Sequence, residues 1–476
     1  MHTVDKLSTK KAWSKAIAKP ATEFAETKLS IISGSIPPSL RGKLYRNGPA
    51  RLERGGIRVG HWFDGDGAIL GIYFGDEGVT STYRYVQTAG YQEEEAAGKL
   101  LYGNYGMTAP GAIWNQWRKP IKNAANTSVL ALPDKLLALW EGGKPHALDL
   151  QTLATKGVDS LAGLEDNLAY SAHPKCDRQT GEIFNFGVSP GIDTTLHIYK
   201  SDRTGKIIQK SATKLDGVPL IHDFVLAGQY LVFFVPPVRV NPLPMLLGLS
   251  SYSDALQWQP KLGTQWLIFD RDSLSLVNRG ETEPWYQWHF SNGYVDSSGA
   301  IVAGMVRYED FETNQYLKEV ATGETHSLAK STLWQIHLHP DTGVTANEQI
   351  IDNHCEFPIV PPQQVGQRAN DTYLSVHRQG IDPSQEIFGA IARFNHTTDT
   401  LTIADMGENR YPTEPIFAPN PANPDTGWII TVVYNGNTDT SEVWVLDSEG
   451  LDREPICKLS LPSVIPPSFH GTWQPG

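Results

Sequence analysis

The sequence lacks the cysteine pattern of a disulfide framework or of a zinc site. Its three cysteines, Cys176, Cys355 and Cys457, are odd in number and far apart, and no C-x-x-C pair occurs. The H-E-x-x-H zinc helix and the G-x-x-x-x-G-K-[ST] phosphate loop are also missing. Metal or phosphate ligands contributed by neighbouring turns of one helix are therefore not expected.

An excess of positive charge and long apolar runs are missing as well. Lys and Arg number 40 against 52 Asp and Glu, a net charge of −12, which excludes nucleic acid as a partner because DNA binding needs a basic face. The N-terminus has no unbroken apolar core, so no signal peptide is expected. The most apolar window, residues 230–249, contains four prolines and Arg239 and cannot span a membrane. A cytoplasmic location is the simplest expectation.

Turn residues, by contrast, are abundant. The chain of 476 residues has 43 Gly and 32 Pro, and from about residue 130 short β-rich runs alternate with turn words such as DRQTGE, KSDRTGK and HPDTG. Many antiparallel hairpins without a repeat of fixed length favour a β-propeller with long loops over a β-sandwich. We therefore predict an all-β fold, with residues 31–476 forming a single propeller domain.

Two segments depart from the hairpin pattern. Within the N-terminal segment 1–30, Trp13, Ala16 and Ile17 lie on one face of a short basic helix, which either packs on the body or contacts a membrane. The second departure is a pair of apolar loops with basic neighbours, which are either buried or in contact with something apolar. The loops carry Ile113, Trp114, Trp117, Leu243, Met245, Leu246, Leu247 and Leu249 beside Arg118, Lys119 and Lys122.

Four of the fourteen histidines share a local setting, an apolar or aromatic neighbourhood at the beginning of a predicted strand. In a ring of blades, metal ligands would come one per blade and lie far apart in the sequence. Taken singly, each is more typical of a core or turn histidine with satisfied nitrogens than of a metal ligand. The four are His173 in LAYSAHPK, His222 in VPLIHDFV, His289 in WYQWHFSNGY and His470 in PPSFHGTW. A competing pair, His337 and His339, shares one face of a strand.

Three glutamates, Glu141, Glu356 and Glu414, stand in unusually apolar company. A buried carboxylate is costly unless it accepts hydrogen bonds or meets a positive charge. The outer N–H of a metal-bound imidazole is one such partner, and it fixes the orientation of the ligand. Four imidazoles and three such carboxylates would suit Fe(II) and leave positions open for dioxygen.

The motifs resemble those of the carotenoid cleavage oxygenases over almost the whole chain. The matching stretches are SGSIPPSLRGKLYRNGPA, HWFDGDGAI, NTSVLALPDKLLALWEGGKPHALD, SAHPK, IHDF, HFSN, CEFPIVPPQQVG, EPIFAPNP and FHGTW. The resemblance implies a seven-bladed β-propeller with a dome of loops and short helices over an axial Fe(II). It also implies that His173, His222, His289 and His470 bind the iron.

Further roles follow from the same resemblance. Glu141, Glu356 and Glu414 match carboxylates that orient His222, His289 and His470 respectively, and His173 has no such partner. Thr127 matches the position beside the open coordination site. Phe63, Trp140 and Trp288 match aromatic positions of a substrate tunnel.

The activity implied by the resemblance is oxidative cleavage of one C=C bond in a carotenoid or apocarotenoid to carbonyl products. Dioxygen is a triplet and reacts slowly with an alkene, so Fe(II) is needed to activate it. The water-insoluble substrate implies peripheral, monotopic contact with a membrane surface. The alternatives are a carotenoid-type isomerase, a propeller lactonase with a central Ca²⁺, and a propeller that serves only as a binding scaffold.

Overall fold

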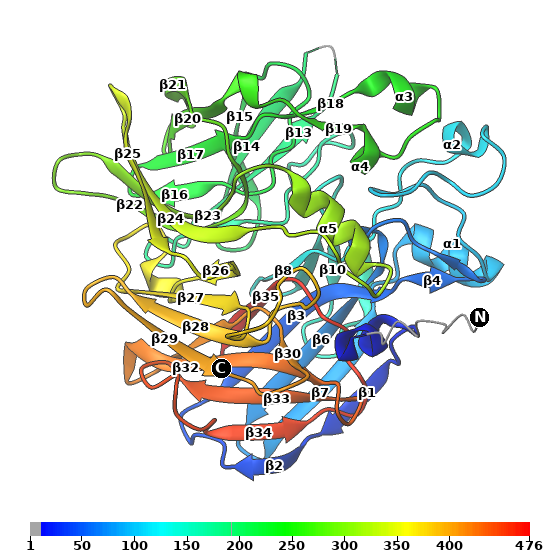
Figure 1. The fold of residues 1–476 in the computed structure, drawn as a ribbon, viewed down its shortest axis with the longest axis vertical. Helices are drawn as coiled ribbons and strands as arrows, with labels where there is room; N and C mark the ends of the chain where they lie inside the picture. The colour runs from blue at the N-terminus through cyan, green and yellow to red at the C-terminus, as the bar shows by residue number, and fades with distance from the viewer. Residues whose placement is uncertain (1–10, 192) are drawn as a thin grey trace, which may run out of the picture.

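The computed structural model describes residues 11–191 and 193–476, and its strands form a ring of seven β-sheets (Figure 1). The predicted seven-bladed β-propeller is therefore confirmed. Every strand pair within the blades is antiparallel, as the hairpin pattern indicates.

Five blades are built from consecutive stretches of the chain, and the blade of β16 carries the small ribbon β18–β19 as an insertion. The first two of these blades contain β8 (Ser128–Ala131), β9 (Leu136–Leu139), β10 (His146–Leu148) and β11 (Thr155–Val158), and then β12 (Lys175–Cys176), β13 (Ile183–Ser189), β14 (Thr195–Ser201) and β15 (Ile207–Lys214). The third contains β16 (Val225–Ala227), β17 (Tyr230–Val235), β20 (Thr264–Asp270) and β21 (Leu276–Thr282), with the ribbon β18 (Val238–Val240) and β19 (Leu256–Trp258). The last two contain β22 (Tyr286–Val295), β23 (Ile301–Tyr308), β24 (Ser331–His339) and β25 (Gly343–Ile351), and then β26 (Cys355–Ile359), β27 (Asp371–Val376), β28 (Ala390–Asn395) and β29 (Thr400–Asp405).

The two remaining blades combine strands from both ends of the chain and so close the ring. One has the order β1 (Phe24–Lys28), β7 (Gly78–Tyr85), β6 (Asp66–Gly75), β3 (Gly42–Arg51) and β35 (Gly471–Pro475), beside the ribbon β4 (Glu53–Arg54) and β5 (Ile57–Arg58). The other has the order β2 (Ser30–Gly34), β34 (Cys457–Ser460), β33 (Thr440–Asp447), β32 (Asn423–Asn435) and β30 (Arg410–Pro412), with β31 (Ile416–Asn420) also on β32. The C-terminal tail is thus a strand of the first blade.

The core lies between neighbouring blades. The rings of Phe186, Phe224 and Phe233 are fully buried, and their centroids lie 5.1 to 5.6 Å apart. These side chains come from β13, from the entrance to β16 and from β17, so the cluster joins two blades. Each such burial contributes about 1.5–3 kcal/mol, which holds the ring rigid around its axis.

Most of the short helices and the loops around them gather on one side of the ring, at the right in the view, and form a dome (Figure 1). Asn314 joins three parts of the dome: its side chain accepts from the Tyr105 hydroxyl at 2.8 Å and donates to Ser253, and its carbonyl contacts His61. The helices are η1 (Ala12–Ile17), η2 (Trp62–Asp64), α1 (Ala89–Ala97), α2 (Asn115–Arg118), α3 (Pro242–Leu246), α4 (Tyr252–Ala255), η3 (Pro260–Leu262), α5 (Glu312–Val320) and η4 (Pro362–Gln364).

The described part of the N-terminal segment packs on the body of the protein, one of the two alternatives that the sequence left open. Among the described residues of this segment only Ala12–Ile17 is helical, and Trp13, Ala16 and Ile17 are buried in a cluster with Tyr411 and Tyr434. The apolar face is therefore covered by the body of the protein. Residues 24–34 are strands of two blades, so the chain has no boundary at residue 30. Residues 1–10 lie outside the described part of the chain.

No helix among the described residues is long and apolar enough to cross a membrane.

Candidate metal centre

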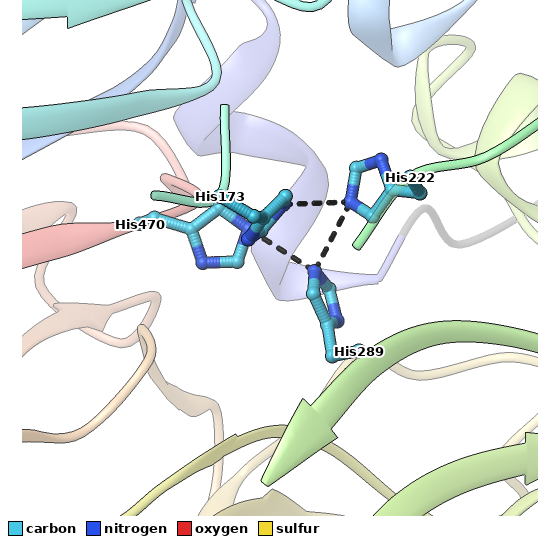
Figure 2. A group of neighbouring side chains, drawn as sticks. All are labelled: His173, His222, His289 and His470. Atoms are coloured by element: carbon cyan, nitrogen blue, oxygen red, sulfur yellow. Dashed lines mark hydrogen bonds between the residues drawn. The ribbon is translucent and has the colours of Figure 1, made fainter. Parts of the chain in front are cut away.

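The structure brings the four selected histidines, which come from four different blades, together in one cluster (Figure 2). His173 lies two residues before β12, His222 three residues before β16 and His470 directly before β35, whereas His289 lies within β22. Their Nε2 atoms follow one another at 2.9 Å from His173 to His222, 3.3 Å from His222 to His289, and 3.1 Å from His289 to His470. In the described part of the chain they are the only such group able to hold a metal ion.

Three of the four imidazoles contact a buried or half-buried carboxylate through Nδ1. His222 contacts Glu141, which follows β9. His289 lies 2.5 Å from Glu356 on β26, and His470 lies 2.8 Å from Glu414 between β30 and β31. These are the pairs implied by the family resemblance, and His173 has no carboxylate on its ring. Each carboxylate comes from a different blade than its histidine.

The carboxylates fix which ring nitrogen faces the centre. When Nδ1 donates to a carboxylate, the neutral ring carries a lone pair on Nε2. The Nε2 atoms of His222, His289 and His470 therefore point lone pairs toward a common centre. Such lone pairs repel one another unless a cation lies between them, so the donor set fits a bound metal ion.

Burial and neighbouring charges shift the pKa values of the groups at the centre in different directions. Burial first, and the neighbouring imidazoles second, hold the pKa values of His173 and His289 well below the usual range of histidine. Burial also opposes the charged form of His222, but the Glu141 carboxylate outweighs it and raises the pKa of that ring. Burial raises the pKa of Glu356 to about 7. Neutral imidazoles are the form of histidine that binds metal ions.

The spacing of the nitrogens also fits a metal. A metal–imidazole bond is about 2.1 Å long, so two nitrogens at a right angle around one ion lie about 3.0 Å apart, against about 3.4 Å at a tetrahedral angle. Two of the observed separations, 2.9 and 3.1 Å, lie near the right-angle value, and the third, 3.3 Å, lies nearer the tetrahedral value. All three separations are short enough for the nitrogens to share one ion.

A cavity of about 1110 Å³ leads to the centre under the dome, and most of its wall is apolar. His222, His289 and His470 lie in its wall, as do the four predicted tunnel residues Phe63, Thr127, Trp140 and Trp288. The Trp288 ring lies 4.9 Å from the His222 ring and 5.5 Å from the Phe63 ring. A long apolar substrate placed in this cavity would pass beside the histidines.

The competing pair, His337 and His339, does not join the cluster. Both lie on β24, and the Nε2 atom of His337 lies 3.0 Å from the side-chain amide nitrogen of Gln335. His354 and His377 line the large cavity without belonging to the group of four.

Sequence reasoning missed Arg46, which holds the tail that carries His470. Its guanidinium is fully buried and donates to the carbonyls of Glu414 and Phe469 at 2.7 and 2.8 Å and to the Ser468 hydroxyl at 3.0 Å. Burial lowers the pKa of Arg46 to about 10. The only sequence signal was a charged residue within the apolar start of β3, and its partners lie far away in the chain.

Replacement of Glu356 by glutamine is expected to weaken metal binding about 10- to 100-fold, the usual cost of losing a partner of a metal-bound histidine. Glu356 accepts from His289, from the Tyr308 hydroxyl at 2.9 Å and from the Phe357 N–H at 2.6 Å, and one amide oxygen cannot satisfy all three. Metal content after dialysis against a chelator measures the effect. Glu442→Gln is the matched control, since Glu442 is buried but bonds only Asn435 and Trp444. Equal metal retention in both variants would contradict the assigned role of Glu356.

Comparison with known proteins places this arrangement among characterised relatives. The family model described as retinal pigment epithelial membrane protein matches residues 17–475. Apocarotenoid-15,15'-oxygenase of Synechocystis is 32% identical over 93% of this chain and 92% of its own. Resveratrol cleavage oxygenase 1 of Aspergillus fumigatus is 25% identical, over 96% and 94% of the two chains.

A crystal structure of cobalt-substituted Synechocystis apocarotenoid oxygenase superposes with a TM-score of 0.90 at 30% identity, covering 98% of both chains. The likeness therefore includes the whole ring and its dome. The cobalt in that relative indicates a metal site in that protein.

Proposed function

This chain belongs to the family of the retinal pigment epithelial membrane protein and the carotenoid cleavage oxygenases, and on that premise we propose that it is a non-haem Fe(II) dioxygenase. The reaction we propose is cleavage of one C=C bond of a carotenoid or apocarotenoid to carbonyl products. The observation that carries the proposal is the centre of four imidazoles at the wall of a large apolar cavity. The name of the Synechocystis relative supports the substrate class.

His173, His222, His289 and His470 would hold the iron, which supplies activation of dioxygen. Glu141, Glu356 and Glu414 keep three of these rings oriented and offset the charge of the ion without taking coordination positions. Thr127 lies in the cavity wall, and its backbone carbonyl accepts from the N–H of His470 at 3.2 Å. This hydrogen bond fixes the position of the His470 backbone beside the cavity.

The aromatic wall would hold the polyene and exclude water. The faces of Phe63, Trp140 and Trp288 are regions of negative potential, so they stabilise positive charge that develops on the substrate. No acid or base is needed to break a C=C bond oxidatively, in keeping with a centre built from imidazole ligands. The position of the polyene in the cavity decides which bond lies at the centre.

The donor set disfavours the other propeller functions. Ca²⁺ prefers oxygen ligands, whereas the atoms that converge here are imidazole nitrogens. A scaffold that only binds partners would gain nothing from three buried or half-buried carboxylates aligned on histidines, because burying a charge is costly. No feature of the centre specifically favours an isomerase over an oxygenase.

Product analysis tests the proposal. The iron-loaded protein is incubated with β-carotene and with an apocarotenal, in air and without oxygen, and the products are identified by mass spectrometry. We expect carbonyl products in air only, with one dioxygen consumed per bond cleaved. Geometric isomers as the sole products, formed equally without oxygen, would support the isomerase instead.

We further propose that the two apolar loops dock on a membrane surface as a cytoplasmic, peripheral contact. Leu246 and Leu249 are 70% and 69% exposed and Trp117 is 59% exposed. The Trp117 indole donates to the Leu246 carbonyl at 3.2 Å, so the two loops form one patch. Met245, Leu246 and Ile121 also line the large cavity, which places the patch at its mouth.

The double change Leu246→Ser and Leu249→Ser is expected to lower co-sedimentation with liposomes by about tenfold or more, since burying each leucine contributes about 1.5–3 kcal/mol. The matched control is Val158→Ser with Ile208→Ser, which removes two equally exposed apolar side chains from β11 and β15. Equal loss in both doubles, or none in either, would count against a docking patch at the cavity mouth.

A further inference from the structure

We propose that Asp223 is a positioning residue that holds three of the four histidine-bearing segments in register. The inference rests on the proposed metal centre, and it concerns a residue that touches neither the histidine rings nor the large cavity. Asp223 directly follows His222 and is 2% exposed. Its carboxylate contacts segments of three neighbouring blades, its own among them, each beside a histidine.

Each contact of Asp223 reaches a different histidine segment. Its Oδ1 atom lies 2.7 Å from the ammonium of Lys175, two residues after His173 on β12. The same oxygen accepts from the N–H of Phe224 at 2.8 Å, which holds its own turn. Its Oδ2 atom accepts from the N–H of Phe290 at 3.0 Å, the residue that follows His289 on β22.

These contacts fit the asymmetry of the centre. His222, His289 and His470 each have a carboxylate on the ring, whereas His173 has none. The Lys175–Asp223 ion pair joins the His173 segment to the neighbouring blade through a residue near His173, and not through the His173 imidazole. Other polar contacts also join these blades, among them the bond from the Gln287 amide to the Phe234 carbonyl at 2.9 Å, but the Asp223 contacts involve residues within two positions of three histidines. A shift of a few tenths of an ångström between blades would move each Nε2 atom by a similar amount.

Asp223 also lies apart from the proposed substrate site. Together with Lys175 and Phe290 it lines a second cavity of about 250 Å³, which also touches His173, His289 and His470. None of the three belongs to the wall of the large cavity. A change at Asp223 therefore reaches the centre through the histidines alone and leaves the polyene contacts intact.

The experiment compares Asp223→Asn, Asp223→Leu and Lys175→Met with the unaltered full chain. Affinity for Co²⁺ is measured by competition with a chelator, and the visible absorption spectrum of the bound Co²⁺ reports the ligand geometry. The matched control is Asp177→Asn, a buried carboxylate near β12 that pairs with Arg271 at 2.7 Å but contacts no histidine segment. Thermal melting of each variant is recorded alongside.

We expect Asp223→Asn to weaken Co²⁺ binding about tenfold and to shift the spectrum, with Asp223→Leu more severe and Lys175→Met milder. For cleavage of an apocarotenal, kcat falls while KM stays within about twofold, because the substrate wall is unchanged. Asp177→Asn should lower the melting temperature without changing the Co²⁺ affinity or spectrum.

The proposal is overturned if Asp223→Asn and Lys175→Met keep the affinity and spectrum of the unaltered protein, whatever their melting temperatures. If Asp223→Leu does not fold, these two variants decide the matter. Failure of the unaltered protein to bind Co²⁺ or Fe²⁺ would instead reject the metal centre itself, so the two failures are distinguishable.

Discussion

Replacement of His289 by alanine is expected to abolish metal binding and cleavage together. Its Nε2 atom lies between those of His222 and His470, at 3.3 and 3.1 Å, so its loss opens the middle of the ligand set. The fall in activity should exceed the roughly 100-fold effect of losing an outer partner of a ligand. Iron content per chain and the rate of aldehyde formation, measured on the same preparation, test this.

The control for His289→Ala is His337→Ala, which removes a histidine on β24 outside the cluster. His289→Ala also leaves the Glu356 carboxylate without its imidazole partner, so a melting curve must accompany the metal analysis. His289→Gln provides a second variant that keeps a polar group near Glu356. Full cleavage activity in a folded His289 variant would rule out His289 as a ligand.

Removal of residues 470–476 is expected to eliminate metal binding and to destabilise the whole ring. The deletion takes away His470 and all of β35, which pairs with β3 over five residues and buries Trp473 against Phe74. Closure of a propeller depends on such a strand, because an open ring leaves an unpaired edge. The melting temperature and the iron content should therefore fall together.

Two milder variants separate the ligand from the strand. Removal of only Gln474, Pro475 and Gly476 keeps His470, Trp473 and three of the five strand pairs, so iron binding should persist. The point variant His470→Ala keeps β35 whole and should lose iron with a much smaller change in melting temperature. A chain that lacks residues 470–476 yet binds iron normally would contradict both the tail's role and the ligand assignment.

Local sequence patterns predict the fold, but they predict only part of the candidate metal centre. Turn motifs between strands of alternating polarity indicate the blades, because a hairpin is a local structure. No local signal assigns β1 to the blade that contains β35, or β2 to the blade that contains β34. The buried face of Trp13 illustrates the same limit. An amphipathic pattern predicts that one face is covered, while the covering residues, Tyr411 and Tyr434, lie about 400 positions away.

Glu356 and Glu414 could be selected because a carboxylate in apolar company needs a partner, and Glu356 and Glu414 are indeed buried beside histidines. Arg46 and Asp223 could not be selected from the sequence. The residues around Arg46 and Asp223 are typical of ordinary strands and turns. Their partners come from other blades, and only the closed ring shows that their charges are satisfied around the centre.

The iron K-edge X-ray absorption spectrum of the iron-loaded protein tests the central claim most directly, because it reports the atoms around the metal. We expect one iron per chain with about four imidazole nitrogens as ligands and no sulfur, at distances near the roughly 2.1 Å typical of metal–imidazole bonds. A shell of oxygen atoms alone, a sulfur ligand, or a protein that binds no iron would contradict it.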